Sequence, residues 1–402
     1  MPLVTTMFNH KALLRIAIVM AFIQFTNALE YMMFNPIFAF MAADFAVPVS
    51  YSGYVSGMYT AGAVLSGIIA FYWIGRLNRK RFLIANMALL GLVTLLTTFT
   101  SNFSLLLILR FCSGLVGGTT MGVGISILIN HAPTNLRGKM LATVIASFSI
   151  VSIAGMPTIL FLCTHYGWHI ALWLISTLCL LALPLIVSII PQDPASFETP
   201  HTLPLDADTL LFASSNALVQ FSSMLVIPVL VPVMTQQLSA SQDLLPWLFF
   251  VGGMSGYLST KMTGALASRI SALILASGST IFFILSLLIP ILGFPHPGLF
   301  ITLFLGASYS RLVSTSVVTI QFPDDKQRAG FASLQTSIMY LTTTVAFFLS
   351  AYLLPGHVMA PRNINTLLAV SAIFASFSPM IIVILQKKLA KRLIQTEHPI
   401  TD

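Results

Sequence analysis

The chain has 402 residues, of which 57% are hydrophobic and only 7% are charged, and its mean hydropathy is +0.93. Soluble domains carry about 25% charged residues, so this composition excludes a soluble globular protein and requires the bilayer as solvent for most of the chain. The formal net charge is +8, but it reflects membrane topology, and no nucleic-acid partner is predicted.

Apolar stretches of about 20 residues recur from end to end, each long enough to cross about 30 Å of hydrocarbon as a helix. The sequence therefore predicts an all-α polytopic membrane protein with twelve transmembrane helices. The predicted spans are 13–40, 51–74, 82–100, 103–130, 140–163, 168–190, 209–234, 244–265, 270–292, 298–320, 329–354 and 365–386.

Lysine and arginine predict the orientation of these spans. With twelve spans, sixteen of these residues fall on the side of the two termini, whereas the other side has only Arg362. The positive-inside rule then predicts cytoplasmic termini and an integral plasma-membrane protein, which in a bacterium means the inner membrane. The first span is too long for a signal-peptide core and is expected to remain in the protein. The basic run at 387–392 is expected to contact anionic lipid headgroups.

In chain order, the first predicted span carries the acid Glu30 far from either end. A charge at bilayer depth costs about 2.5–3.5 kcal/mol on insertion scales, so it normally has a function or a partner. At 100° per residue, several polar and aromatic residues fall on the same face within an arc of about 140°. These residues are Gln24, Asn27, Tyr31, Phe34 and Asn35.

The fourth span carries a second deep charge, Arg110. At 1.5 Å per residue, Glu30 and Arg110 lie at comparable depth in the outer half of the membrane. Burial favours the protonated carboxyl, whereas a neighbouring arginine favours the ionised form. Two hypotheses follow: the pair is a proton switch that substrate operates, or it is a permanent ion pair that locks two helices together.

The longest polar stretch, 191–208, contains four acids and no Lys or Arg, and it divides six predicted spans from six. The halves on its two sides resemble each other. The segment 133–142 after span 4 and the segment 323–332 after span 10 have the same length, begin with proline and contain basic residues and a glycine. The predicted domains are a six-helix bundle at 1–190, a cytoplasmic linker at 191–208 and a second six-helix bundle at 209–402. Two such halves are an architecture of secondary transporters, with the substrate site near the midplane.

The second half contributes its own polar positions. Asn216 and Gln220 lie in span 7, Arg311 and Thr315 in span 10, and Gln335 in span 11. Arg311 is the third deep charge. It is expected either to anchor a carboxylate or phosphate, or to bond backbone carbonyls or snorkel to the cytoplasmic face.

Three short segments carry a family resemblance. Residues 109–118 (LRFCSGLVGG) in span 4 resemble motif B of the major facilitator superfamily, in its twelve-span drug:proton antiporter branch with the sugar-efflux-like members. Residues 154–157 (AGMP) resemble the core of that branch's motif C, and 166–168 (YGW) resemble the loop that follows. The resemblance covers almost the whole chain and implies two pseudo-symmetric six-helix bundles, with spans 1, 4, 7 and 10 lining the cavity.

The chain departs from the family in the loop between spans 2 and 3. Residues 71–80 (FYWIGRLNRK) keep the basic residues, but Gly75 replaces the family's aspartate, and the second copy has Ser268 there. Motif C has lost its trailing glycines, with Ile159 and Phe161 among the replacements. The resemblance implies conformational gating residues at Gly155, Pro157, Arg76, Arg79 and Arg269.

These features predict a secondary active transporter that moves a small organic solute by alternating access, as proton-coupled efflux of a drug or metabolite. The alternative is uptake or facilitated transport of an anionic metabolite. Proton coupling is assigned to Glu30 and Arg110. Substrate binding is assigned to Gln24, Asn27, Tyr31, Phe34, Arg110, Asn216, Gln220, Arg311, Thr315 and Gln335. The three deep charges sum to +1, which favours neutral, zwitterionic or anionic solutes over lipophilic cations.

Enzyme chemistry finds no support in the sequence. It has no glycine loop for phosphate, no metal-binding His or Cys cluster and no nucleophile motif, so no cofactor or metal is predicted. The expected partners are a small-molecule substrate, the proton and the lipid bilayer, and the chain is expected to act as a monomer. A receptor or structural membrane protein is the rival class, and it has no need of the repeat.

Overall fold

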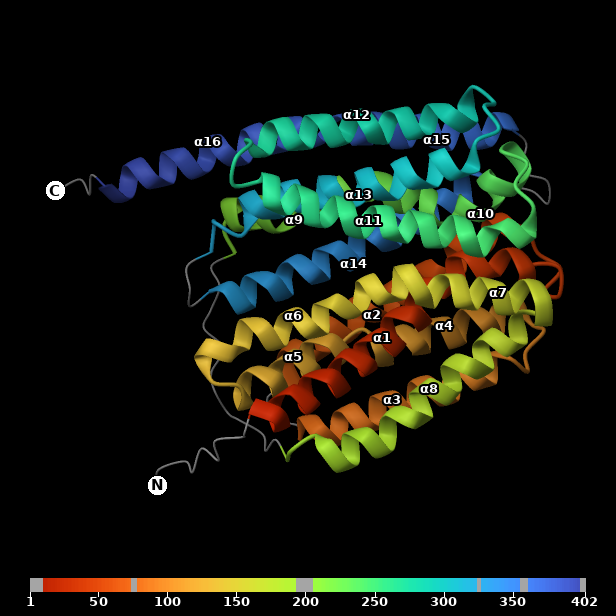
Figure 1. Cartoon of the computed structure of the whole chain (residues 1–402), viewed down its shortest axis with the longest axis horizontal. Coiled ribbons are helices and arrows are strands. Elements are labelled where there is room, and N and C mark those ends of the chain that lie inside the picture. Colours follow the sequence, from red (N-terminus) through yellow and green to blue (C-terminus); the bar gives the residue numbers. More distant parts are fainter. Residues whose placement is uncertain (1–9, 74–77, 193–204, 324–326, 355–360, 398–402) are drawn as a thin grey trace. The chain divides into compact units, whose positions relative to one another are not determined.

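The computed structural model describes residues 10–73, 78–192, 205–323, 327–354 and 361–397. Within those ranges the regular structure is entirely helical (Figure 1). Twelve helical passes correspond one to one with the twelve predicted spans, and the predicted fold class is confirmed.

The first six passes are single helices or pairs of helices in continuous succession. They are α1 (His10–Met41), α2 (Ser52–Trp73) after the short η1 (Val49–Tyr51), α3 (Arg79–Thr97), α4 (Phe103–Gly117) with α5 (Thr120–His131), α6 (Thr134–Ile150) with η3 (Val151–Gly155) and α7 (Met156–Tyr166), and α8 (Trp168–Ile189).

The last six passes follow the same plan. They are α9 (Ala207–Val226) with η4 (Ile227–Val229), α10 (Leu230–Pro232) and η5 (Val233–Gln237), α11 (Leu245–Leu266) after η6 (Gln242–Leu244), α12 (Ala272–Ile291), α13 (Pro297–Thr319), α14 (Arg328–Leu353), and α15 (Pro361–Ser376) with α16 (Ser378–Glu397).

In the described part of the chain, ten helices are long and apolar enough to cross a membrane. The other two passes, α2 and α11, have 22 residues each. Both contain several glycine, serine and tyrosine residues. Length alone still suits them to about 30 Å of hydrocarbon, and the chain is an integral membrane protein.

The chain forms two compact units. The first contains the described residues up to Phe45 and those from Met58 to Gln192, and the second contains Ala46–Gly57 together with the described residues from Leu205 onward. The first turn of α2 therefore groups with the second unit, which no feature of the sequence indicated. The assignment of 1–190 and 209–402 as two functional bundles stays a prediction.

Glycines bring α2 and α4 to backbone contact inside the first unit. A Cβ at Gly62 would collide with the carbonyl oxygen of Phe111, and one at Gly114 would collide with that of Tyr59. Since a membrane offers no hydrophobic drive between helices, such close packing is a main source of their association. It sets Tyr59 of α2 directly beside the residues of α4.

Two of the interrupted passes, α6–α7 and α9–α10, are irregular next to prolines. In the first unit, the π-helical turn η3 directly precedes Met156 and Pro157. In the second, Pro228 lies inside the 3-10 turn η4, and Pro232 ends α10 directly before the π turn η5. A proline lacks the backbone donor and crowds the preceding turn, so the local hydrogen-bond register shifts. At η3 the chain also packs closely on α1, because a Cβ at Gly155 would lie 2.9 Å from Leu29 Cδ1.

Candidate functional site

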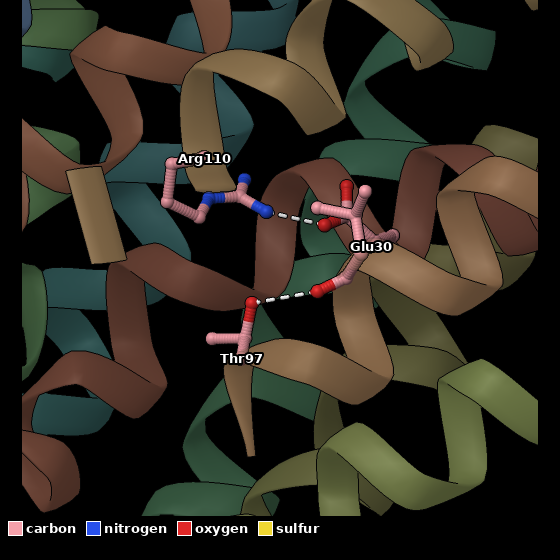
Figure 2. A network of polar contacts seen from close by, with 4 residues as sticks. Glu30, Thr97 and Arg110 are labelled. Carbon is pink, nitrogen blue, oxygen red and sulfur yellow. Dashed lines mark hydrogen bonds and ion pairs between the residues drawn. The ribbon is translucent and has the colours of Figure 1, made fainter. Parts of the chain in front are cut away.

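The first unit contains a fully buried ion pair. Glu30 projects from the middle of α1 and Arg110 from the middle of α4, and both are 0% exposed. Arg110 Nη1 donates a hydrogen bond to Glu30 Oε1 (Figure 2). The predicted proximity of these two residues is confirmed, although 80 residues separate them in the sequence.

Aromatic rings cover the arginine side of the pair. The Arg110 Cζ lies 3.7 Å from the ring centre of Phe34 and 4.9 Å from that of Tyr59. The Tyr59 ring in turn stacks on Tyr31 at 4.9 Å between centroids. A guanidinium over a desolvated ring gains about 2 kcal/mol, which helps to hold a cation at this depth. Phe34 therefore covers the Arg110 guanidinium, and Tyr31 stacks on Tyr59, the second covering ring. Both were predicted to lie on the face of α1 that carries Glu30.

Several buried polar atoms of the pair are left unpaired. Among the described residues, Glu30 Oε2 and Arg110 Nε and Nη2 have no hydrogen-bond partner. The hydroxyls of Thr94 and Ser113 lie beside the Glu30 carboxyl, but neither completes a hydrogen bond in this structure. Thr97, drawn in Figure 2, is different, because its hydroxyl donates to the Val93 carbonyl at 2.9 Å.

So many unpaired polar atoms around one buried ion pair suggest that the pair has a role beyond holding two helices together. An unsatisfied buried polar group costs about 1–3 kcal/mol, so native structures keep few of them without a use. A pair that only locks two helices would gain from satisfying both carboxyl oxygens. Here one oxygen of Glu30 holds Arg110, and the other has open acceptor capacity for a proton or a hydroxyl.

Asn27 extends the polar face of α1 by one turn. Its Nδ2 donates to the Gly117 carbonyl at 3.2 Å, while its Oδ1 is unpaired within the described residues. A Cβ at Gly117 would meet both Asn27 Oδ1 and the Tyr59 hydroxyl, so glycine leaves room there for this contact. Gln24, a further turn away, is buried.

The second unit holds Arg311 in a different setting. It is 0% exposed, and its guanidinium donates to Ser222 Oγ at 2.8 Å and to the Ala375 carbonyl at 3.3 Å. The Arg311 Cζ also lies 4.6 Å from the centre of the Phe283 ring. In the described part of the chain no carboxylate pairs with it. The bond to the Ala375 carbonyl is of the second kind predicted for Arg311, whereas the bond to the Ser222 hydroxyl was not predicted. The anion-anchoring role of Arg311 stays a prediction.

The remaining predicted binding residues of the second unit are amides and one hydroxyl. Asn216 Nδ2 donates to Ser316 Oγ at 3.0 Å, and Thr315 Oγ1 donates to the carbonyl of Arg311 at 3.0 Å. Within the described residues, Asn216 Oδ1, Gln220 Oε1 and Gln335 Nε2 are buried without a partner. Thr315 is thus engaged inside its own helix, whereas the three amides keep open capacity.

Comparison with known proteins agrees with the family expected from the sequence. The Major Facilitator Superfamily model matches residues 20–209. The bacterial homologue of the human lysosomal transporter Spinster, in an inward-facing and occupied conformation, has the same fold, with a TM-score of 0.73 over 92% of this chain and 96% of that one at 14% identity. The nucleoside transporter NupG superposes with a TM-score of 0.74 over 93% and 99% at 12% identity.

These similarities support the major facilitator superfamily, the family expected from the sequence.

Curated relatives carry transporter names. A probable sugar efflux transporter of Mannheimia succiniciproducens is 28% identical over 194 residues, 47% of this chain and 49% of that one. The niacin transporter NiaP of Acinetobacter baylyi is 24% identical over 38% of this chain and 35% of that one. The chain thus aligns with about half of the first relative and a third of the second. The purine ribonucleoside efflux pump NepI of Shigella sonnei aligns over 86% and 88% at 23% identity.

The matching family model and the curated relatives are those of transporters, which are not enzymes. The residues predicted to act in conformational gating differ in burial and in the elements that carry them. Arg76 lies outside the described residues, while Arg79 begins α3 and is buried. Gly155 ends the π turn η3, Pro157 lies in the first turn of α7, and Arg269 is exposed after α11. Their gating roles stay predictions.

The structure also brings in residues that the sequence did not single out. Tyr59 and Thr94 join the Glu30 site, and Ser222 and Phe283 join Arg311. Tyr59 had a weak signal, since it lies three residues before Gly62 in a span rich in glycine. Thr94, Ser222 and Phe283 are ordinary residues of apolar helices, and no pattern in the sequence marks them.

Proposed function

We propose that this facilitator is a proton-coupled exporter of a small organic solute in a bacterial inner membrane, working by alternating access with both termini cytoplasmic. One observation carries the proposal: the buried Glu30 holds Arg110 with one carboxyl oxygen and keeps the other unpaired among the described residues. The efflux names of the sugar and purine ribonucleoside relatives support the direction.

The chemistry of coupling follows from the two charge states of Glu30. Ionised, the carboxylate neutralises Arg110 in a medium where an isolated charge is costly. Protonated, it no longer compensates the cation, and Arg110 is left with the rings of Phe34 and Tyr59 and its unpaired N–H groups. A substrate hydroxyl needs the unpaired Oε2 of the ionised Glu30, which is also the atom that a proton would occupy. Proton and substrate therefore compete for one carboxyl, which is what antiport requires.

The alternative function is uptake or facilitated transport of an anionic metabolite. Two relatives favour it by name, the niacin transporter NiaP and the 4-hydroxybenzoate transporter PcaK, both of Acinetobacter baylyi. Arg311 is the observation in this chain that agrees with it, because its charge has no carboxylate partner in the described residues. Its guanidinium is occupied by Ser222 and Ala375, so export of a solute that needs no buried cation is preferred.

Transport by purified protein in proteoliposomes tests the proposal. The solutes are a monosaccharide, inosine, chloramphenicol, nicotinate and 4-hydroxybenzoate, each assayed with and without an imposed pH gradient. At least one is expected to move against its own gradient when protons flow the other way. Glu30→Gln is expected to abolish that accumulation while keeping exchange of labelled for unlabelled solute, because the amide keeps the shape but carries no exchangeable charge. Undiminished gradient-driven flux in Glu30→Gln rules out the coupling role.

A further inference from the structure

The last pass of the second unit is interrupted beside Arg311. Helix α15 ends at Ser376 and α16 begins at Ser378, with Pro379 in the first turn of α16. We propose that Arg311 is a positioning residue of this pass, because it supplies the hydrogen bond that Pro379 cannot donate. This role concerns the folded second unit and does not depend on proton coupling at Glu30.

The position of the proline identifies the carbonyl that is left without its helical partner. In a continuous α-helix, the carbonyl of residue 375 accepts a hydrogen bond from the N–H of residue 379, four positions later. Proline has no N–H, and its ring crowds the carbonyl four residues before it, so the helix is broken there. The freed carbonyl belongs to Ala375, which is 0% exposed. It therefore needs a donor from elsewhere in the protein.

Arg311 of α13 is that donor. Its Nη2 donates to the Ala375 carbonyl at 3.3 Å, and its Nη1 donates to Ser222 Oγ of α9 at 2.8 Å. The hydroxyl of Ser371, one turn before Ala375 on α15, donates to the Ser222 carbonyl at 2.8 Å. All four of these residues are 0% exposed. The end of α15 is therefore joined to both α13 and α9 by buried hydrogen bonds.

The backbone at the break has the irregularity that a proline produces. The Phe377 N–H donates to the Phe374 carbonyl, three residues back, at 3.4 Å, whereas the Ile381 N–H donates to the Phe377 carbonyl, four residues back, at 3.0 Å. The spacing of the bonds thus changes across Pro379. A segment with such weak internal bonding depends on partners from other helices, and Arg311 is one of them.

A second proline break in this unit is closed in a similar way. In a continuous helix the Pro228 carbonyl would accept from the N–H of residue 232, but that residue is Pro232. Ser52 Oγ donates to this carbonyl instead. Ser52 is 0% exposed and begins α2, whose first turn belongs to the second unit. At both breaks a side chain from another pass replaces the missing backbone donor.

This role explains how Arg311 persists at bilayer depth without a carboxylate partner in the described residues. Membrane helices tolerate proline where a neighbouring helix satisfies the freed backbone group. Ala375 is the last residue but one of α15, so the guanidinium also lies at the negative end of that helix dipole. The cation and the break therefore stabilise each other, and no anionic solute is needed to account for Arg311.

A double-mutant cycle on the purified full-length protein in one detergent tests the proposal. The variants are Arg311→Met, Pro379→Ala and their combination, and the measurements are the unfolding temperature and the hydrogen exchange of the segment 372–385. Arg311→Met is expected to lower the unfolding temperature and to speed this exchange about two- to tenfold, the loss of about one hydrogen bond. Pro379→Ala restores an N–H for the Ala375 carbonyl, so both effects of Arg311→Met are expected to shrink in that background.

Pro184→Ala is the matched control, because it also restores an N–H inside a helix, in α8 of the first unit. It is expected to leave both effects of Arg311→Met unchanged. Additive effects of Arg311→Met and Pro379→Ala overturn the proposal, and so does an equal rescue by Pro184→Ala. If Arg311→Met does not fold, a folded double variant supports the proposal and an unfolded one overturns it.

Nicotinate binding by the same proteins tests the rival role of Arg311 as an anion anchor. Wild type and the double variant are expected to bind nicotinate equally, or neither to bind it. Loss of nicotinate binding in a double variant as stable as Pro379→Ala would identify an anchor and overturn the positioning role. None of these measurements uses a proton gradient, so the proposed coupling at Glu30 can fail or hold independently of their result.

Discussion

At the residue scale, the two deep arginines show how differently one membrane protein can keep a buried cation. Arg110 has a carboxylate on one side and two aromatic rings over its face, with N–H groups left over. The Arg311 guanidinium bonds one hydroxyl and one backbone carbonyl and lies over one ring. Of its three nitrogens, Nε is without a partner in the described part of the chain. Charge neutralisation can be switched by a proton, whereas dipoles and rings cannot. Of these two arginine sites, the Arg110 site is the one that agrees with the proposed proton coupling.

Thermal unfolding of single and double variants at the pair is expected to show strong coupling. Arg110→Met strands a carboxyl in an apolar helix bundle, and breaking a buried pair costs about 3–5 kcal/mol. Adding Glu30→Gln to Arg110→Met removes that stranded acid and is expected to recover at least about 1 kcal/mol. Unfolding temperatures of the four proteins in one detergent measure this. Additive losses would mean that the two side chains do not interact in the folded protein.

At the scale of helices, glycine determines how closely the elements of the first unit approach. Gly62 and Gly114 let α2 and α4 meet backbone to backbone, and this contact carries Tyr59 to Arg110. The glycine of motif B thus acts on the site through packing: it sets the position of a ring that covers the arginine four residues earlier. The π turn before Pro157 similarly allows α6 and α7 to stay packed on α1 through Gly155.

Replacement of Gly114 by alanine is expected to destabilise the protein far more than the same change at Gly122. A Cβ at Gly114 collides with the Tyr59 carbonyl, whereas one at Gly122 meets nothing within 4 Å. Overpacking against backbone costs about 1–3 kcal/mol, while Gly122→Ala gains helix propensity of up to about 1 kcal/mol. Unfolding temperatures of the two variants provide the comparison. Equal stability would show that α2 and α4 are farther apart in the membrane.

At the scale of the whole molecule, the sequence predicted the features that depend on hydropathy summed over a span. It predicted few of the features that depend on how each helix is rotated about its own axis. Hydropathy summed over each span gave twelve helical passes, and depth along the helices was enough to bring Glu30 to Arg110. Depth does not determine which way a helix is turned, so Tyr59, Thr94 and the partners of Arg311 were missed. The grouping of the first turn of α2 with the second unit was also missed, because it depends on contacts between segments that are distant in the sequence.

The orientation of the whole molecule is predicted by its basic residues and can be tested with two matched cysteines. Ser241 and Ser271 are both exposed residues that precede a helix, in successive connectors on opposite ends of α11. Lys261 lies in the C-terminal part of α11 and Arg269 in the connector that contains Ser271, so the positive-inside rule places this connector in the cytoplasm and Ser241 outside. In intact cells of a cysteine-free background, a membrane-impermeant maleimide is expected to label Ser241→Cys at once. It should label Ser271→Cys only after permeabilisation, and the reverse pattern would invert the topology and the proposed direction of the proton.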